Sequence, residues 1–249
     1  MSDLRDWFYS LPIFTRYWLL CTVVCSLLGR FDIINPRLLI LKNDRFINNF
    51  EIWRAATSVF YYPIFPSAFH FLINCYFLYN YSLRLERGEY DGRPADYCFL
   101  LLFNWICCVI IGLIGEFHYL MDPMVLSILY VWCQLNKDAL VNFLFGSQFK
   151  AIYLPWVLFA FNLIVSGGGT MELFGILVGH LYVFFKFKYP QELGGPELLN
   201  TPKILETYFP SQRGNIRRFG AAPVQRTQAQ QTRNIFGGHN WGRGHVLGE

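Results

Sequence analysis

The side chains that could do chemistry are few, and each stands inside a long apolar stretch. His70 and Asn74 are four residues apart, so they share one face of a helix. Ser127 and His180 stand singly in two later stretches. A hydroxyl nucleophile, an imidazole base and oxyanion donors are what acyl transfer requires. A lone polar residue in a membrane helix serves equally well as a hydrogen-bond partner of a neighbouring helix, so both roles stay open.

Two further patterns have structural interpretations. Gly175 and Gly179 precede His180 with a spacing that lets one membrane helix approach another closely. Trp53 and Arg54 adjoin, as an ordinary anchor at the membrane interface would. The seven cysteines all fall in apolar stretches, and no pair has the spacing of a metal site. We therefore predict no metal and no cofactor.

The composition is that of a membrane protein. Hydrophobic residues make up 54% of the 249 residues and charged residues only 15%, whereas a soluble domain has roughly a quarter charged. A membrane helix needs about 20 mostly apolar residues. Six stretches qualify, giving an all-α membrane helix bundle with spans at about Thr15–Gly29, Thr57–Tyr81, Ala95–Gly115, Tyr119–Asn136, Ala151–Ser166 and Met171–Phe187. Pro63 and Pro66 predict an irregular start to the second span.

The basic residues predict the orientation. The segments after spans two, four and six are rich in Lys and Arg, whereas the loops after spans three and five have none. The positive-inside rule then places both termini in the cytosol. Loop one, residues 30–56, carries several basic residues on the opposite side, and we interpret it as a folded amphipathic element.

The composition changes near residue 189. We predict a transmembrane domain over residues 1–188 and a flexible cytosolic tail over 189–249, because the tail is rich in Gly, Pro, Gln, Asn and Arg. Its end regains aromatic residues and glycines.

Together these residues resemble the rhomboid superfamily, whose fold is a six-transmembrane helix bundle. The resemblance rests on Trp53-Arg54, His70-x-x-x-Asn74 and Gly175-x-x-x-Gly179-His180. In rhomboid proteases a serine flanked by glycines on span four attacks the substrate. Here Ser127 lies between Leu126 and Ile128. Bulky neighbours obstruct a substrate backbone and displace the donors of an oxyanion hole, so the resemblance implies a pseudoprotease rather than an enzyme.

Longer strings resemble the derlin family within that superfamily: YNYSLRLERGEYDGRPAD at Tyr79–Asp96, LYVWCQLN at Leu129–Asn136 and HNWGRGHVLG at His239–Gly248. The resemblance implies a protein of the endoplasmic reticulum membrane that helps misfolded proteins return to the cytosol for degradation. It implies three kinds of partner: the valosin-containing AAA ATPase, membrane ubiquitin ligases with their adaptors, and misfolded clients. It also implies homo- or hetero-oligomers, and nothing indicates nucleic-acid binding.

The tail end resembles the SHP box, through which derlins bind that ATPase. Trp241 and Leu247 would fill pockets, while Gly242, Gly244 and Gly248 allow close backbone approach. A glycine-rich flexible end is the plainer interpretation.

Inside the bundle, we predict a polar cavity that lowers the cost of bringing peptide groups into hydrocarbon. Its candidate lining residues are His70, Asn74, Asn104 and His180. Two other functions remain as alternatives. An active intramembrane serine protease would need an accessible nucleophile. A small-solute channel with ion coupling would be expected to carry charges within its helix centres.

Overall fold

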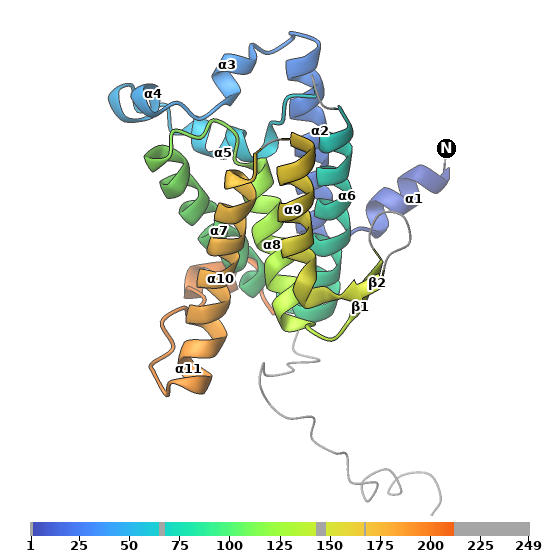
Figure 1. The fold of residues 1–249 in the computed structure, drawn as a ribbon, viewed down its shortest axis with the longest axis vertical. Helices are drawn as coiled ribbons and strands as arrows, with labels where there is room; N and C mark the ends of the chain where they lie inside the picture. Colours follow the sequence, from blue (N-terminus) through green and yellow to red (C-terminus); the bar gives the residue numbers. More distant parts are fainter. Residues whose placement is uncertain (1, 65–67, 143–147, 167, 212–249) are drawn as a thin grey trace, which may run out of the picture. The chain divides into compact units, whose positions relative to one another are not determined.

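A computed structural model describes residues 2–64, 68–142, 148–166 and 168–211 (Figure 1). The chain divides into two units, Met1–Asn215 and Ile216–Glu249, and all that follows concerns the first. The residues of the predicted ATPase-binding motif, Trp241 to Gly248, lie outside the described residues, so that motif stays a prediction.

Helices make up most of the first unit. A short helix α1 (Ser2–Ser10) precedes α2 (Ile13–Arg30), and loop one then folds into α3 (Pro36–Leu39) and α4 (Asn43–Asn48). The later helices that build the bundle are α5 (Trp53–Phe60), α6 (Ala68–Arg84), α7 (Pro94–Ile114), α8 (Met121–Leu135), α9 (Leu154–Ser166) and α10 (Thr170–Val183). Within the described residues, three helical segments are long and apolar enough to cross a membrane: Ile13–Arg30, Pro94–Ile114 and Thr170–Glu192. Two shorter apolar helices, Met121–Leu135 and Ala151–Ile164, lie between the last two.

The stretch expected as the second span holds two helices rather than one. α5 ends at Phe60 and α6 begins at Ala68. Pro63 lies in the non-helical backbone after α5, because proline lacks the N–H that would continue a helix. The predicted single span is therefore divided into α5 and α6.

Wider helical turns and a small strand pair join these helices. A π-helical segment η1 (Leu85–Glu89) extends α6, and another, η4 (Phe184–Lys188), extends α10 into α11 (Tyr189–Glu192). Strands β1 (Leu140–Asn142) and β2 (Gln148–Lys150) pair antiparallel with Val141 opposite Phe149, and a short 3₁₀ turn η3 (Ala151–Tyr153) leads into α9. The composition had predicted helices alone.

Helix α8 is the centre of the bundle, with α6, α7, α9 and α10 around it (Figure 1). Its seam with α10 is close because α10 has glycines there. A Cβ on Gly175 would lie 2.8 Å from the carbonyl oxygen of Pro123, and one on Gly179 would lie 2.7 Å from that of Ser127. Even alanine at either position would force the two helices apart.

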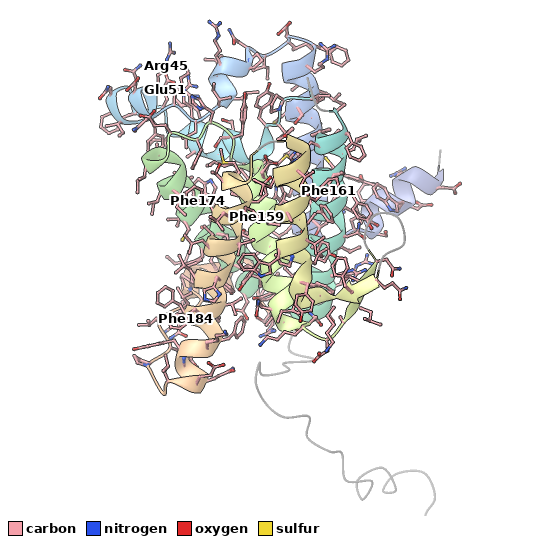
Figure 2. All side chains as sticks on the ribbon, viewed as in Figure 1. Arg45, Glu51, Phe159, Phe161, Phe174 and Phe184 are labelled. Carbon is pink, nitrogen blue, oxygen red and sulfur yellow. The ribbon has the colours of Figure 1, made fainter. Side chains whose placement is uncertain are left out.

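The buried arginine Arg54 holds loop one in place through hydrogen bonds and an ion pair. Arg54 is fully buried, donates to the carbonyl oxygens of Arg37 and Ile40 at 2.6 and 3.0 Å, and forms an ion pair with Glu51. Its neighbour Trp53 is 54% exposed. Figure 2 shows Glu51 with Arg45 at the loop-one end of the helices and Phe184 at the opposite end. Arg54 therefore has a structural role, holding α3 and the start of α5 together.

The chain beyond residue 188 keeps contact with the bundle as far as Phe209. Thr201 donates to Asp96 at 2.5 Å, and Lys186 donates to the carbonyl oxygen of Leu199 at 2.6 Å. After the short helix α12 (Lys203–Tyr208), the Phe209 ring lies 5.1 Å from that of Phe14. These specific contacts extend the packed structure about twenty residues past the change in composition.

Candidate functional site

Four helices bring polar side chains together at the loop-one end of the bundle. His70 and Asn74 come from the first two turns of α6, Asp122 from the first turn of α8, and Glu172 from the first turn of α10. Asn162 approaches from α9. These five residues are called the Asp122 cluster below.

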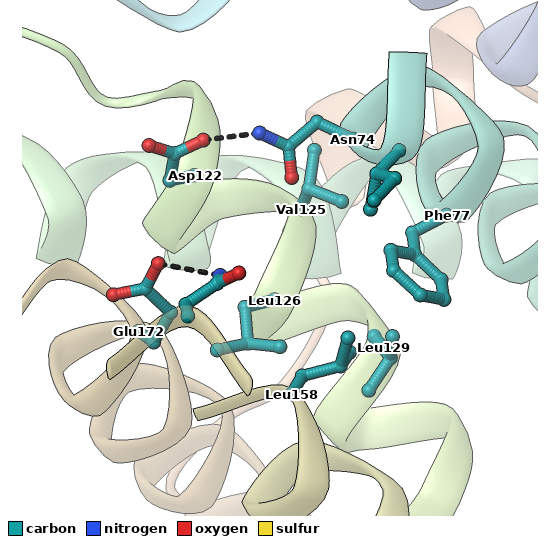
Figure 3. Close-up of a pocket in the computed structure, with 10 residues that line it drawn as sticks. Asn74, Phe77, Asp122, Val125, Leu126, Leu129, Leu158 and Glu172 are labelled. Atoms are coloured by element: carbon teal, nitrogen blue, oxygen red, sulfur yellow. Dashed lines mark hydrogen bonds between the residues drawn. The ribbon is translucent and has the colours of Figure 1, made fainter. Parts of the chain in front are cut away.

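The hydrogen bonds of the cluster run between helices (Figure 3). The Asn74 amide donates to Asp122 at 2.5 Å, joining α6 to α8. The Asn162 amide donates to Glu172 at 2.7 Å, joining α9 to α10. The Nε2 atom of His70 lies 3.8 Å from the same oxygen of Asp122, and a protonated imidazole would form an ion pair there.

A small cavity lies beneath the carboxylates. Its volume of about 20 Å³ holds roughly one water molecule. Asp122 and Glu172 line it together with an apolar floor that includes Phe77, Leu126 and Leu158 (Figure 3). The Asp122 side chain is only 15% exposed and Glu172 only 6%. Two carboxylates thus face one buried space.

The cluster has more acceptors than donors. An ionised carboxylate offers about four lone-pair sites, and among the described hydrogen bonds each of these two receives one amide donor. Burying a carboxylate is costly unless hydrogen bonds or charges compensate it. In a membrane helix bundle such groups commonly mark a path for a substrate or ion. The spare acceptor sites suit a small donor, such as one water molecule or a single N–H group at the cavity.

Ser127 and His180 do not form the nucleophile–base pair of a protease in this structure. Ser127 is fully buried, and its hydroxyl donates to the carbonyl oxygen of Met124 at 2.7 Å. The Nδ1 atom of His180 pairs with the Tyr130 hydroxyl at 2.8 Å, on the exposed side of α10. Each group has its own partner, so the hydroxyl has no base to activate it here.

Of the four residues expected to line a polar cavity, the structure brings together His70 and Asn74. His180 faces the exposed side with Tyr130. Asn104 is fully buried midway along α7, and neither amide atom has a hydrogen-bond partner among the described residues. Asn104 therefore stands apart from the Asp122 cluster.

The sequence reasoning missed Asp122, Asn162 and Glu172. Both acids fall near the start of predicted spans, Tyr119–Asn136 and Met171–Phe187, yet neither acid nor the asparagine was singled out. Two signals were present. Acids favour the first turn of a helix, and a polar amide inside an apolar stretch needs a partner. The structure supplies that partner by setting the ends of α9 and α10 side by side.

A second polar cluster lies at the opposite end of the bundle, where α2 begins. Glu86 of η1 accepts from the backbone N–H groups of Phe14 and Thr15 at 3.0 and 2.8 Å, and from the Thr15 hydroxyl at 2.7 Å. The Thr15 hydroxyl also meets that of Ser82 at 2.7 Å, which in turn meets the Tyr97 hydroxyl at 2.6 Å. Thr15, Ser82, Glu86 and Tyr97 are called the Glu86 cluster below. Beside it, burial raises the pKa of Tyr90, which pairs with Tyr182 at 3.2 Å.

Comparison with known proteins gives the family. The sequence model of the Der1-like family matches residues 11–203. A protein named Derlin-1 from Homo sapiens is 50% identical over 250 residues, covering all of both chains. Proteins of the same name from Caenorhabditis elegans and Drosophila melanogaster are 48% and 47% identical, with 95% or more of each chain covered.

This chain belongs to the Der1-like family. Its predicted fold class, an all-α membrane helix bundle, is confirmed by the helices and by the family. Both polar clusters fall within the residues that the Der1-like model matches. The tail motif lies beyond them, although the alignment with the human relative extends over it.

Proposed function

We propose that this Der1-like protein acts in degradation associated with the endoplasmic reticulum, helping misfolded lumenal or membrane proteins return to the cytosol. The human relative named Derlin-1 matches it over its whole length, and the Caenorhabditis elegans relative over 96% of it. The observation that carries the proposal is the Asp122 cluster, an acceptor-rich polar site buried in a membrane bundle.

The cluster would work by hydrogen bonding. A peptide N–H that enters hydrocarbon without a partner costs several kcal/mol. Asp122 and Glu172 offer acceptor oxygens to such groups, and a hydrogen bond to an ionised carboxylate is about twice as strong as a neutral one. His70 stands beside Asp122 and can supply a compensating charge when it is protonated. An extended client segment would thus cross the first part of the membrane at lower cost.

The protein would not be an enzyme. Ser127 is buried against its own helix, and His180 is paired with Tyr130. The force for extraction would come from the AAA ATPase, recruited by the tail, with membrane ubiquitin ligases and adaptors as further partners. We place both termini in the cytosol, since the basic loops follow spans two, four and six.

The orientation has a natural reporter. Asn80-Tyr81-Ser82 is an acceptor sequence for N-glycosylation. The proposed topology keeps Asn80, near the end of α6, on the cytosolic side. A glycosidase-sensitive mass shift at Asn80 would show that the proposed orientation is wrong and that Asn80 faces the lumen.

The partner proposal is tested with the tail. Trp241→Ala with Leu247→Ala should abolish co-purification of the AAA ATPase, because truncating a buried Trp anchor commonly costs about 2 kcal/mol or more. The matched control is Ile235→Ala with Phe236→Ala, just before the motif. Membrane insertion and ligase binding should persist. Normal recovery of the ATPase with the first pair would place the contact on the cytosolic loops.

A further inference from the structure

A large apolar groove lies between α2 and α7, next to the Glu86 cluster, since Phe14 lines the groove and its N–H group donates to Glu86. Its volume is about 460 Å³. Tyr17 and Cys21 of α2 form one wall, and Cys98 and Leu102 of α7 form the other. Phe209 contributes at the end where α2 begins, packed on Phe14. The groove between these two helices is thus lined by apolar surface.

The groove has the depth of one membrane leaflet. Its lining on α2 runs from Ile13 to Cys21, which is about 12 Å at 1.5 Å per residue. Half of the hydrocarbon core is about 15 Å. The groove therefore extends from the interface near the start of α2 towards the middle of the bilayer.

The side chains that line the groove are almost entirely apolar. A single hydrocarbon chain is narrower than a helix and suits such walls.

Two arginines lie near the aromatic side chains at the start of α2. The Arg16 guanidinium lies 5.1 Å from the centre of the Tyr17 ring, which lines the groove, and 5.6 Å from the Tyr9 ring. The Arg5 guanidinium lies 5.7 Å from that same Tyr9 ring. Two like charges therefore converge on one aromatic side chain, an arrangement that an anion between them would stabilise.

Arg16 has unused hydrogen-bonding capacity. Its Nε atom is buried without a hydrogen-bond partner, and no carboxylate forms an ion pair with it, within the residues that the structure describes. The carboxylate of Glu86 is engaged by the start of α2. A phosphate group suits a guanidinium of this kind, because the planar donors match its oxygens.

We propose that the α2–α7 groove binds one acyl chain of an anionic glycerophospholipid, with the lipid phosphate held by Arg16 and Arg5. The lipid comes from the leaflet at the N-terminal side of the protein. The site is independent of the Asp122 cluster and of the function proposed for it.

The site is tested by photolabelling the full-length protein in nanodiscs. The probe is phosphatidic acid with a diazirine in its acyl chain, competed with unlabelled phosphatidic acid or phosphatidylcholine of the same chains. Labels should map to groove-lining peptides of α2 and α7, and phosphatidic acid should compete better. Arg16→Gln should weaken labelling about fivefold, since one basic residue near the surface contributes about 1 kcal/mol. Arg30→Gln, at the other end of α2, is the control.

A pair of bulky substitutions tests the groove. Leu102→Trp fills it and should abolish the labels, whereas Ile106→Trp, one turn further along α7 and outside the lining, should leave them. Equal competition by the two lipids would overturn the phosphate site. Labels that survive Leu102→Trp would overturn the acyl-chain site, as would crosslinks showing a second copy or a client helix against Cys21. The lipid competition and the crosslinks are read in the wild-type protein, so a misfolded variant does not decide those two outcomes.

Discussion

The two ends of the bundle each bury a polar cluster, and the clusters differ in how their carboxylates are hydrogen-bonded. Glu86 receives two backbone N–H groups and a hydroxyl, all from the start of α2. Asp122 and Glu172 each receive a single amide donor in the described structure. A well-satisfied carboxylate fixes the elements it joins, whereas one with spare acceptor sites is costly to bury and can take a ligand. The contrast separates a structural link from a candidate site.

The largest stability effect is expected at the structural link. Glu86→Ala leaves the N–H groups of Phe14 and Thr15 without their acceptor, and should lower the free energy of unfolding by about 2–4 kcal/mol, since each lost partner costs about 1–3 kcal/mol. Glu86→Gln keeps one acceptor oxygen and should cost less. Thermal unfolding in detergent measures both. If the Glu86→Ala variant were as stable as the wild-type protein, the Glu86 cluster would not be a structural link, and the proposed difference between the two clusters would be wrong.

The next effect belongs to the seam that holds α8 against α10. Gly175→Ala and Gly179→Ala should each cost about 1–3 kcal/mol, because the new methyl group meets backbone atoms. Gly88→Ala is the control, since a Cβ there meets nothing within 4 Å. Equal stability of all three variants would show that the helices separate easily. Gly175→Ala should also disturb client binding, because it acts one turn from Glu172.

At the Asp122 cluster, the expected effect is on binding rather than stability. Asp122→Asn with Glu172→Gln keeps the shapes but removes the charges, so unfolding should change by less than about 1 kcal/mol, or the protein should gain stability. Retention of a misfolded client should fall about fivefold, because a neutral acceptor forms a hydrogen bond weaker by about 1 kcal/mol. Co-purification of the client measures this. A large loss of stability would make this cluster a structural link like the other.

The smallest effect is expected at Ser127. Ser127→Ala removes a hydrogen bond within α8 and should leave client clearance unchanged, with a stability loss of about 1 kcal/mol or less. A fluorophosphonate probe should not label Ser127. Loss of clearance by an abundant, folded Ser127→Ala protein would revive the protease alternative.

Hydropathy and the spacing of His70, Asn74, Gly175 and Gly179 were enough to predict the helical bundle and the two residues that α6 contributes to the five-residue Asp122 cluster. The two acids were not predicted as site residues, because Asp122 and Glu172 lie where apolar stretches begin. Only the packing of the helices shows that both side chains face the cavity. Asn104 and His180 were grouped with the cavity because hydropathy cannot tell which face of a helix meets a neighbour.

Contacts between residues far apart in the sequence could not be predicted from the sequence either. The hydrogen bond from Thr201 to Asp96 spans 105 positions, and it explains why the packed structure continues beyond the change in composition. The hydrogen bonds from Arg54 to the carbonyl oxygens of Arg37 and Ile40 likewise depend on how loop one folds. Neither leaves a periodic pattern in the sequence.

The central claim is that a client chain enters the membrane beside the Asp122 cluster. A photoreactive residue at position 73 tests it most directly, because Ile73 lines the cavity while its neighbour Leu72 is 64% exposed on the outside of α6. Irradiation in the presence of a misfolded lumenal client should crosslink the client from position 73 and much less from position 72. Charge removal at Asp122 and Glu172 should weaken the crosslink. Equal crosslinking from both positions, or none from position 73 while the client remains bound, would contradict the account.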